Sequence, residues 1–382
     1  MLSFKIFFQE RKYFAPAFIY SCFALVFSTW VIYIPFLVEK LKISEGQLGT
    51  ALFFAALGSF VMTPLSNKLT DILGVGRQTF IGFILFGTSL YGIFLAPNYT
   101  LLSVALFYYG MTSSVFAIAL NSLTAIIEKM AGKYIMTGSH GFWSIGGVIG
   151  ASLGSFIAGK FNQPLIHISV LLILLIGIQV YLRKEYIHIK GEVRTKGDRK
   201  KNLFKPLVLI ASIGMIMMVS EGAIADWSGL YLQNVVMMQP HLLGLGYAFF
   251  SAGMTLGRFT GDAMSYRFGS WKLLRIAFSI SLIGFVWVLT SMAWVTLTGF
   301  FIIGVGFSIV VPEVFRLASN IKGVRPADGI SIVAATSNIG VLAGPALLGF
   351  IAEVSGLFFS FVTLASLVSV ALILTWVGKR RH

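Results

Sequence analysis

The chain has 382 residues, of which 57% are hydrophobic and 11% are charged, with a formal net charge of +15. A soluble chain carries about 25% charged residues, so this composition excludes a soluble globular protein and indicates one embedded in a lipid bilayer. The positive charge does not favour a nucleic-acid partner, because the basic residues are spread over loops that would face anionic lipid.

Apolar segments long enough to span a bilayer recur along the whole chain. A transmembrane helix needs about 20 mostly apolar residues. Two longer apolar runs must each fold back once, at the turn-forming stretches "APNYT" (Ala96–Thr100) and "SMAW" (Ser291–Trp294). We therefore predict an all-α membrane protein with twelve transmembrane helices. In chain order these cover residues 14–37, 47–67, 78–96, 101–127, 138–158, 164–182, 205–232, 242–265, 272–291, 295–320, 328–352 and 357–378.

The basic residues indicate how the chain is oriented. With twelve spans, alternate loops share a side, and all but three of the 29 lysine and arginine residues fall on one side. The exceptions are Lys40, Lys42 and Lys160. The positive-inside rule then places both termini in the cytoplasm. We expect a multi-pass protein of the bacterial inner (plasma) membrane without a cleaved signal peptide, since the first apolar run is long enough to span.

The two halves of the chain are similar in sequence. Residues 48–74 align with 243–269 at an offset of 195, with Gly58 opposite Gly253, and residues 145–158 align with 339–352 at an offset of 194. Parallel six-helix halves are one of the transporter designs, in which the solute site lies near the membrane midplane. We predict an N-terminal six-helix bundle (1–182), a cytoplasmic basic connector (183–204) and a C-terminal six-helix bundle (205–382).

These features are similar to those of the major facilitator superfamily over essentially the whole chain. Besides the repeat and the basic connector, the segment "PLSNKLTDILGVGR" after the second predicted helix resembles the family signature Gly-x-x-x-Asp-(Arg)-x-Gly-Arg. Asp71, Gly74 and Arg77 match or nearly match it, whereas Asn67 replaces the first glycine and Ile72 replaces the first arginine. The resemblance implies that this segment controls the switch between inward-facing and outward-facing states.

A second copy of the signature segment follows in the other half, "GRFTGDAMSYRFG". It keeps Arg267 and Gly269 but has Tyr266 at the position of the acid. The resemblance implies that charge pairs at the cytoplasmic helix ends control the switch. The expected gating residues of both copies are Asp71, Gly74, Arg77, Arg258, Asp262 and Arg267.

Two further stretches are similar to the branch of the superfamily around the fucose–proton symporters. They are "SEGAIADWSGLYL" (Ser220–Leu232) and "GVGFSIVVPEVFRLA" (Gly304–Ala318), the latter with the Pro-x-x-Phe of that branch. Those symporters carry an acid in their first helix, but the first predicted helix here has no carboxylate before Glu39. The resemblance implies a sugar-like solute and a coupling proton, whose site must lie elsewhere, for example at Glu221.

Two carboxylates interrupt the helix predicted over 205–232. The uncharged stretch 206–220 is too short to span, so the helix must continue through Glu221 and Asp226. At a rise of 1.5 Å per residue from Lys205, Glu221 lies roughly 24 Å and Asp226 roughly 31 Å into the membrane. With no cation expected at that depth, desolvation favours the protonated form of Glu221. We expect Glu221 to be the proton-coupling site and Asp226 a secondary relay or outer gate.

Each of these interpretations has a structural alternative. Glu221 could be a protonated acid that only hydrogen-bonds a neighbouring helix, and Asp226 could cap a helix end. Glu313 and Arg316 lie three residues apart on one helical face, where they could form a local ion pair, line the solute cavity, or do both. Amides could hydrogen-bond the solute, and tryptophans could stack on a sugar face or simply pack. The expected cavity residues are Trp30, Asn121, Trp143, Trp227, Glu313, Arg316 and Asn338.

The sequence therefore predicts a secondary active transporter of a small polar, sugar-like solute that uses alternating access and a proton as the coupling ion. We expect a monomer that is not an enzyme and needs no cofactor or metal, since no P-loop motif occurs and the five histidines are scattered. Two alternatives stay open. One is a drug or metabolite exporter of the proton-antiporter type, and the other is a non-transporting membrane sensor or scaffold.

Overall fold

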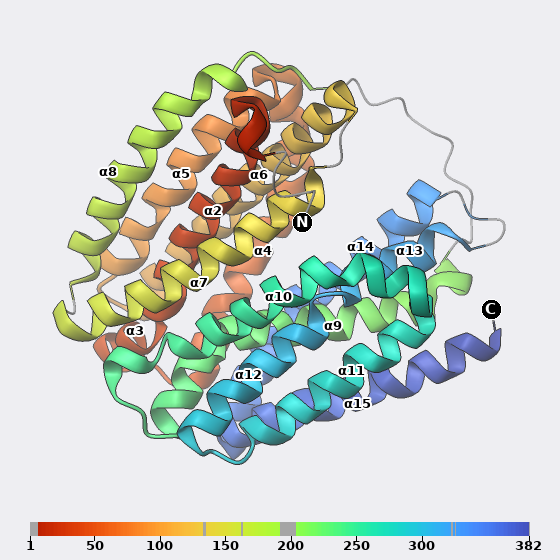
Figure 1. Ribbon diagram of the computed structural model, residues 1–382. Helices are drawn as coiled ribbons and strands as arrows, with labels where there is room; N and C mark the ends of the chain where they lie inside the picture. Colours follow the sequence, from red (N-terminus) through yellow and green to blue (C-terminus); the bar gives the residue numbers. More distant parts are fainter. Residues whose placement is uncertain are drawn as a thin grey trace. The chain divides into compact units, whose positions relative to one another are not determined.

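Helices make up nearly all of the protein that the structure describes. The computed structural model describes residues 7–132, 135–161, 163–191, 204–321, 324 and 326–381, and within these ranges it contains no strand (Figure 1). Eleven helical segments in this part are long and apolar enough to cross a membrane. The predicted span 242–265 corresponds to a further helix, α10 (Leu245–Phe268), several of whose side chains lie outside the described part. The prediction of an all-α, multi-pass membrane protein is confirmed.

The chain divides into two compact units, one formed by Met1–Thr195 with Pro240–Leu242 and one by Lys196–Gln239 with Leu243–His382. The first contains α2 (Arg11–Ile32), α3 (Ile34–Leu41), α4 (Glu45–Leu73), α5 (Val75–Leu95), α6 (Tyr99–Ala131), α7 (Met136–Phe161), α8 (Pro164–Leu182), and the 3-10 turns η1 (Arg183–Glu185) and η2 (Pro240–Leu242). The second contains α9 (Phe204–Asn234), α10, α11 (Ser270–Val288), α12 (Ala293–Phe307), α13 (Val310–Ser319), α14 (Pro326–Ser355) and α15 (Leu357–Arg381). Residues 192–203 of the predicted connector lie outside the described residues, so its boundaries stay a prediction.

Two of the predicted helices are broken near a proline. The span predicted as 14–37 consists of α2 and α3, with Pro35 as the second residue of α3. The span predicted as 295–320 consists of α12 and α13, with Pro312 as the third residue of α13. Proline lacks an amide hydrogen and its ring clashes with the carbonyl group four residues earlier, which favours a break just before it. Both predictions of a continuous helix were wrong for this reason.

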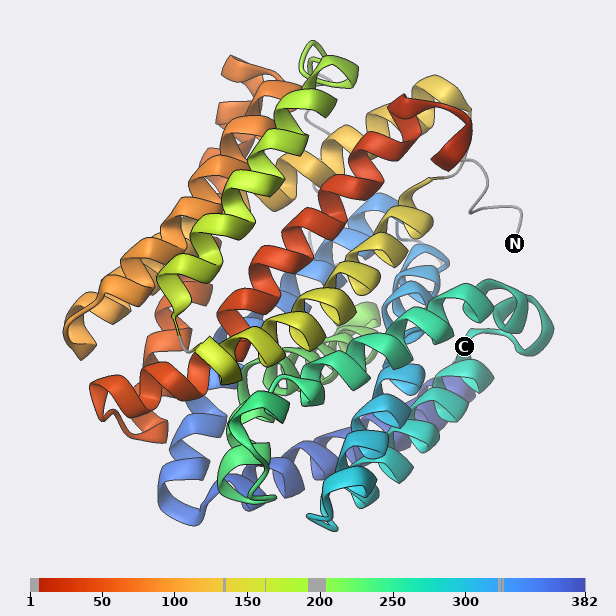
Figure 2. The same cartoon turned by 60° about the vertical axis from the view of Figure 1, so that its left-hand side comes forward.

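The predicted repeat is visible in the helix crossings within each unit (Figure 1; Figure 2). In the first unit α4 packs on α6, and a Cβ atom on Gly58 would overlap the carbonyl oxygen of Phe107. In the second unit α10 packs on α12, and a Cβ atom on Gly253 would overlap the carbonyl oxygen of Phe301. These pairs correspond at the offsets of 195 and 194 found in the sequence. The equivalence of Gly58 and Gly253 is therefore confirmed.

The same correspondence holds at the turn that follows each of these helices. Gly74 ends α4 with φ 78°, and Gly269 ends α10 with φ 72°. Both values lie in the left-handed region that glycine adopts without steric cost. In both units this glycine lets the chain leave one helix and begin the next at the following residue.

A carboxylate of α6 caps the beginning of α7. The Oε2 atom of Glu128 accepts hydrogen bonds from the backbone N–H groups of Ile135, at 2.7 Å, and of Met136, at 2.8 Å. The first N–H groups of a helix have no partner within the helix, so an acceptor at this place stabilises its start.

We expect Glu128→Ala to lower the free energy of unfolding by about 1–2 kcal/mol, because two partly buried N–H groups lose their acceptor. Glu128→Gln keeps an acceptor oxygen at the same place, so it should lose less. Denaturant unfolding of the purified protein in detergent measures both differences. An alanine variant as stable as the unmodified protein would contradict this role of Glu128.

Candidate functional site

The helix α9 carries both of its carboxylates within one long apolar segment. It runs from Phe204 to Asn234, and its membrane-compatible part, Pro206–Asn234, includes Glu221 and Asp226. Both side chains are half-buried. The prediction that a spanning helix continues through the two acids is confirmed, and the chain therefore holds carboxyl groups in a helix long enough to cross a membrane.

A cation of α10 interacts with one of these carboxylates. Glu221 and Arg258 lie close enough to interact electrostatically, and Tyr247 of α10 interacts with Glu221, Arg258 and Asp226. The expectation that Glu221 has no cation at its depth was wrong. Long helical side chains point back toward the helix N-terminus, so the guanidinium of Arg258 lies displaced from the level of its own Cα atom. We call Glu221, Asp226, Tyr247 and Arg258 the acid–arginine cluster.

Sequence reasoning missed Tyr247, although its spacing carried a signal. Tyr247 and Arg258 are eleven residues apart, about three helical turns, which puts them on one face of α10. Tyr247 is buried, at 6% exposure. A buried phenol on the arginine-bearing face indicates a polar stripe through an otherwise apolar helix, directed at the carboxylates of α9.

The acid–arginine cluster has a simple chemistry. A nearby guanidinium stabilises the charged form of a carboxyl group. Removal of the group from water instead favours its neutral, protonated form. Protonation of Glu221 would therefore remove its electrostatic attraction to Arg258, and deprotonation would restore it. Glu221 can thus be balanced either by a bound proton or by the charge of Arg258.

A second pair of charges lies on α13. Arg316 donates from Nη1 to Oε1 of Glu313 over 2.7 Å, so the local ion pair, one of the predicted alternatives, is present. Glu313 is 2% exposed, whereas the side chain of Arg316 is 42% exposed. The other carboxylate oxygen of Glu313 is buried and has no hydrogen-bond partner among the described residues. The pair follows directly after the break between α12 and α13, and interrupted helices commonly mark ion or solute sites in transporters.

We expect Arg316→Met to lower the free energy of unfolding by about 2 kcal/mol, because it leaves the buried carboxylate of Glu313 without its partner. The double variant Glu313→Leu with Arg316→Met removes both charges, so it should be more stable than the single variant. Thermal or denaturant unfolding of the three proteins in one detergent measures the order. A double variant less stable than Arg316→Met would contradict this explanation.

In the first unit, the predicted cavity residue Asn121 is part of a polar group. Its Oδ1 atom accepts a hydrogen bond from the Tyr20 hydroxyl over 2.6 Å, and its amide donates to the carbonyl oxygen of Ala117 over 2.8 Å. The ring of His140 lies 4.8 Å from the ring of Tyr20. The sequence analysis did not single out Tyr20, although a buried tyrosine usually needs a hydrogen-bond partner for its hydroxyl.

The three predicted tryptophans have different surroundings. Trp30 is 2% exposed and lies 6.1 Å from the ring of Tyr109, while Trp227 is 1% exposed. Trp143 is half-buried and meets the ring of Phe23 edge-on, 4.5 Å between centroids. The contacts of Trp30 fit ordinary packing. The buried indole N–H group of Trp227 has no hydrogen-bond partner among the described residues. Asn338, the last predicted cavity residue, is exposed on α14.

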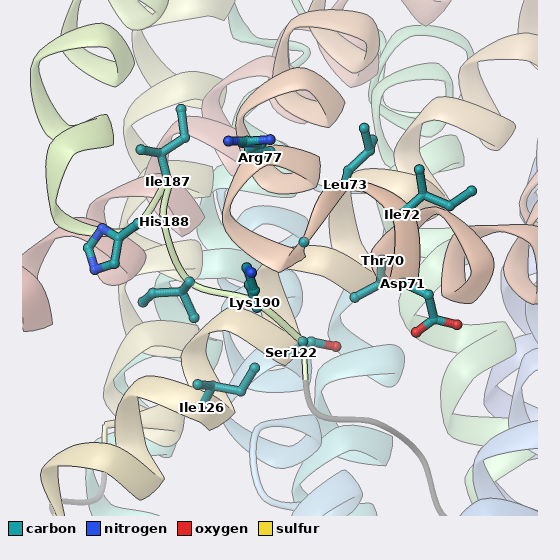
Figure 3. Close-up of a pocket in the computed structure, with 13 residues that line it drawn as sticks. Thr70, Asp71, Ile72, Leu73, Arg77, Ser122, Ile126, Ile187, His188 and Lys190 are labelled. Carbon is teal, nitrogen blue, oxygen red and sulfur yellow. The ribbon is translucent and has the colours of Figure 1, made fainter.

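The predicted gating residues of the first unit surround the turn between α4 and α5. Asp71 and Arg77 are exposed, and both line a cavity of about 830 Å³ together with Gly74 (Figure 3). The segment after α8 lies against this turn, where the N–H group of Gly76 donates to the carbonyl oxygen of Ile189 over 3.0 Å. Sequence reasoning missed this contact because it joins residues far apart in the chain.

The corresponding gating residues of the second unit lie toward the end of α10. Arg267 is exposed, and its guanidinium lies 5.4 Å from the ring centre of Phe268. The side chain of Asp262 lies outside the described part of the chain. Arg258, which the sequence analysis assigned to gating, is also a member of the acid–arginine cluster through its electrostatic interaction with Glu221, and its gating role stays a prediction.

Comparisons with known proteins agree with this architecture. The chain is 30% identical over 347 residues to an uncharacterised MFS-type transporter of Yersinia pestis, covering 89% of each chain. It is 22% identical over 360 residues to the quinolone resistance protein NorA of Staphylococcus aureus, covering 87% of this chain and 90% of NorA. A crystal structure of a mutant of the nucleoside transporter NupG superposes with a TM-score of 0.74 at 12% identity, over 97% of this chain and 100% of that one.

The family model of the Major Facilitator Superfamily matches residues 17–327. This range includes the signature segment at the end of α4 and the start of α5, the acid–arginine cluster and the broken helix α12–α13. The paired six-helix architecture agrees with the match. The chain belongs to the Major Facilitator Superfamily of membrane transporters.

Proposed function

We propose that this transporter moves a small polar, sugar-like solute and uses a proton as its coupling ion. The observation that carries the proposal is that Glu221 lies within the membrane-compatible part of α9 and interacts electrostatically with Arg258 of α10. An ionisable residue within a transmembrane helix costs roughly 2.5–3.5 kcal/mol on insertion scales, and such residues generally mark a proton, ion or solute path. A proton and an arginine are alternative partners for Glu221, which is the property a coupling site needs.

In the proposed cycle, Glu221 binds a proton when it is accessible from the more acidic side, and its attraction to Arg258 is lost. The transporter changes its access with proton and solute bound, and Glu221 releases the proton on the other side and attracts Arg258 again. Asp226, five residues or about 1.4 helical turns beyond Glu221, acts as a second relay or outer gate. Each positive charge that moves inward gains about 2.3 kcal/mol per 100 mV of membrane potential.

The remaining assignments belong to the same proposal. The solute would be bound by amide, charged and aromatic side chains of the membrane helices, and the switch would involve the two signature segments. The proposed solute contacts are Trp30, Asn121, Trp143, Trp227, Glu313, Arg316 and Asn338, with Tyr20 added because it holds Asn121. The proposed gating residues are Asp71, Gly74, Arg77, Arg258, Asp262 and Arg267, and Arg258 is also part of the proposed coupling site.

We also propose the location and organisation that the charge distribution supports. The protein would lie in the bacterial inner membrane as a monomer with both termini in the cytoplasm, since nearly all basic residues fall on one side of the predicted topology. Its parts would be the bundles 1–182 and 205–382 and the basic connector 183–204.

Reconstitution into liposomes tests the proposal. A thermal-shift screen against sugars, nucleosides, peptides and amphipathic drugs first identifies a solute that stabilises the purified protein, since a ligand that binds only the folded state raises its stability. Uptake of that solute is then measured with and without an imposed pH gradient. We expect accumulation only when the gradient is present. Uptake that reaches the same level without a gradient would contradict proton coupling.

A second candidate function is the export of drugs or metabolites by proton antiport. The similarity to NorA supports it, as does the Gly-x-x-x-Gly-Pro sequence at Gly340–Pro345 of α14, a motif that the drug–proton antiporters place in their fifth helix. The fifth span here, α7, has Ala151 in place of that proline. The direction of the pH gradient that drives accumulation distinguishes the two functions. A symporter moves its solute in the same direction as the protons, whereas an antiporter moves it in the opposite direction.

A further inference from the structure

The cavity beside the α4–α5 turn has no role in the proposed proton path. Its walls come from residues 70–74 and 77, from Ser122 and Ile126 of α6, and from residues 187–191 after α8, all within the first unit (Figure 3). Its volume is about 830 Å³. By the positive-inside rule this end of the unit faces the cytoplasm, so the cavity would be open to cytoplasmic solutes and close to the lipid headgroups.

The fold fixes the wall that follows α8. Tyr186 is fully buried, and its hydroxyl donates to Oε1 of Gln179 over 2.8 Å. The N–H group of Gly76 donates to Ile189, and a Cβ atom on Gly76 would overlap the carbonyl oxygen of Tyr186. The segment can therefore lie against the turn because residue 76 is a glycine. These contacts fix Ile189 against the turn and so hold the residue after it, Lys190, at the cavity.

Two cations at this cavity have no partner among the residues that the structure describes. Arg77 and Lys190 both line it, and neither forms an ion pair or hydrogen bond with any residue that the structure describes. The aliphatic part of Lys190 lies against Gly74, since its Cγ atom is 3.9 Å from the position that a Cβ atom on Gly74 would occupy. The carboxylate of Asp71 also lines the cavity, but Figure 3 shows it to one side, away from both cations. The cavity thus has a basic part whose charges are not neutralised by any residue among 7–132, 135–161 and 163–191, the described residues of this unit outside Pro240–Leu242.

We propose that this cavity binds a phosphate-bearing ligand, held by the guanidinium of Arg77 and the ammonium of Lys190. A guanidinium can donate two parallel hydrogen bonds to a phosphate, and an ammonium adds a point charge with three donors. The N-terminus of α5, which begins at Val75, adds a favourable dipole on the same side. The phosphate belongs either to an anionic lipid headgroup or to a soluble phosphate compound.

Binding here would hold the segment after α8 against the turn that carries the family's signature. Lys190 belongs to one of these elements and Arg77 to the other, so a phosphate between them would join the two. This site is separate from the acid–arginine cluster, and its occupancy can be measured without any transport assay. If the proposed proton coupling were wrong, the proposal of a phosphate site in this cavity would still stand or fall by its own test.

The test measures protection of a cysteine placed in the cavity. Ile126→Cys is introduced into the full-length protein with Cys22→Ser, and its rate of reaction with a water-soluble maleimide is measured. Inorganic phosphate in detergent, at matched ionic strength against chloride, is the soluble probe. Phosphatidylcholine vesicles with or without phosphatidylglycerol provide the lipid probe. We expect at least one probe to slow labelling, and removal of one cation by Lys190→Gln or Arg77→Gln to weaken that protection about fivefold.

Lys184→Gln is the matched control, because Lys184 is an exposed lysine of the same segment that does not line the cavity. It should leave the protection unchanged. Protection by phosphate alone assigns the site to a soluble compound, protection by phosphatidylglycerol alone assigns it to a lipid headgroup, and protection by both supports the shared chemistry. Absence of protection by either probe, or protection that persists in both Lys190→Gln and Arg77→Gln, would overturn the proposal.

Discussion

Glu221→Gln should abolish accumulation driven by a pH gradient while leaving exchange of the solute across the membrane intact. Glutamine has nearly the volume of a protonated glutamic acid but cannot release a proton, and it no longer attracts Arg258 as a charge. With one proton per solute, a gradient of one pH unit supports about tenfold accumulation, because one unit of pH corresponds to 1.36 kcal/mol. We expect the unmodified protein to approach this ratio and the variant to stop at equal concentrations.

Reconstituted liposomes measure both activities with one labelled solute. Glu39→Gln is a suitable control, since Glu39 is an exposed carboxylate at the end of α3, outside the acid–arginine cluster. It should transport as the unmodified protein does. A Glu221→Gln protein that still concentrates its solute with normal pH dependence would show that Glu221 is structural. A variant that neither exchanges nor accumulates, although it is monodisperse and thermally stable, would also count against a role limited to coupling.

Gly110→Leu should be strongly destabilising, with a loss of about 3 kcal/mol or more in the free energy of unfolding. A Cβ atom on Gly110 would overlap the carbonyl oxygen of Ala55, so any side chain forces α6 away from α4. Gly304 occupies the equivalent place in the second unit, against the carbonyl oxygen of Phe250. Gly304→Leu should therefore cost a similar amount. Unfolding of the purified variants in detergent measures the loss.

The control for this pair is Gly177→Ala in α8, where an added Cβ atom meets nothing within 4 Å. Because glycine in a helix interior is less favourable than alanine by about 1 kcal/mol, this variant should be as stable as the unmodified protein or slightly more so. A tolerated Gly110→Leu would mean that α4 and α6 do not cross as closely as described. Unequal losses at Gly110 and Gly304 would mean that the two crossings are not energetically equivalent.

Those parts of the fold that depend on local composition could be predicted from the sequence. In lipid each backbone polar group must be satisfied within its own segment, so an apolar run of sufficient length has to be a helix. The same argument correctly extended α9 through Glu221 and Asp226. The prolines that break two helices, Pro35 and Pro312, were visible in the sequence, but helices elsewhere continue through Pro16 and Pro345. Local sequence alone therefore did not distinguish a tolerated proline from a breaking one.

The sequence by itself determined the membrane character of the protein, its helical class and its internal repeat, because these follow from composition, run length and residue spacing. Only the tertiary structure decided which polar groups meet. It brought Arg258 toward Glu221 and joined Tyr20 to Asn121. It also placed the segment after α8, which contains Tyr186, in contact with Gly76. Such contacts join residues distant in sequence, and they depend on which helix faces pack together and how far each side chain reaches, which periodicity along one helix does not specify.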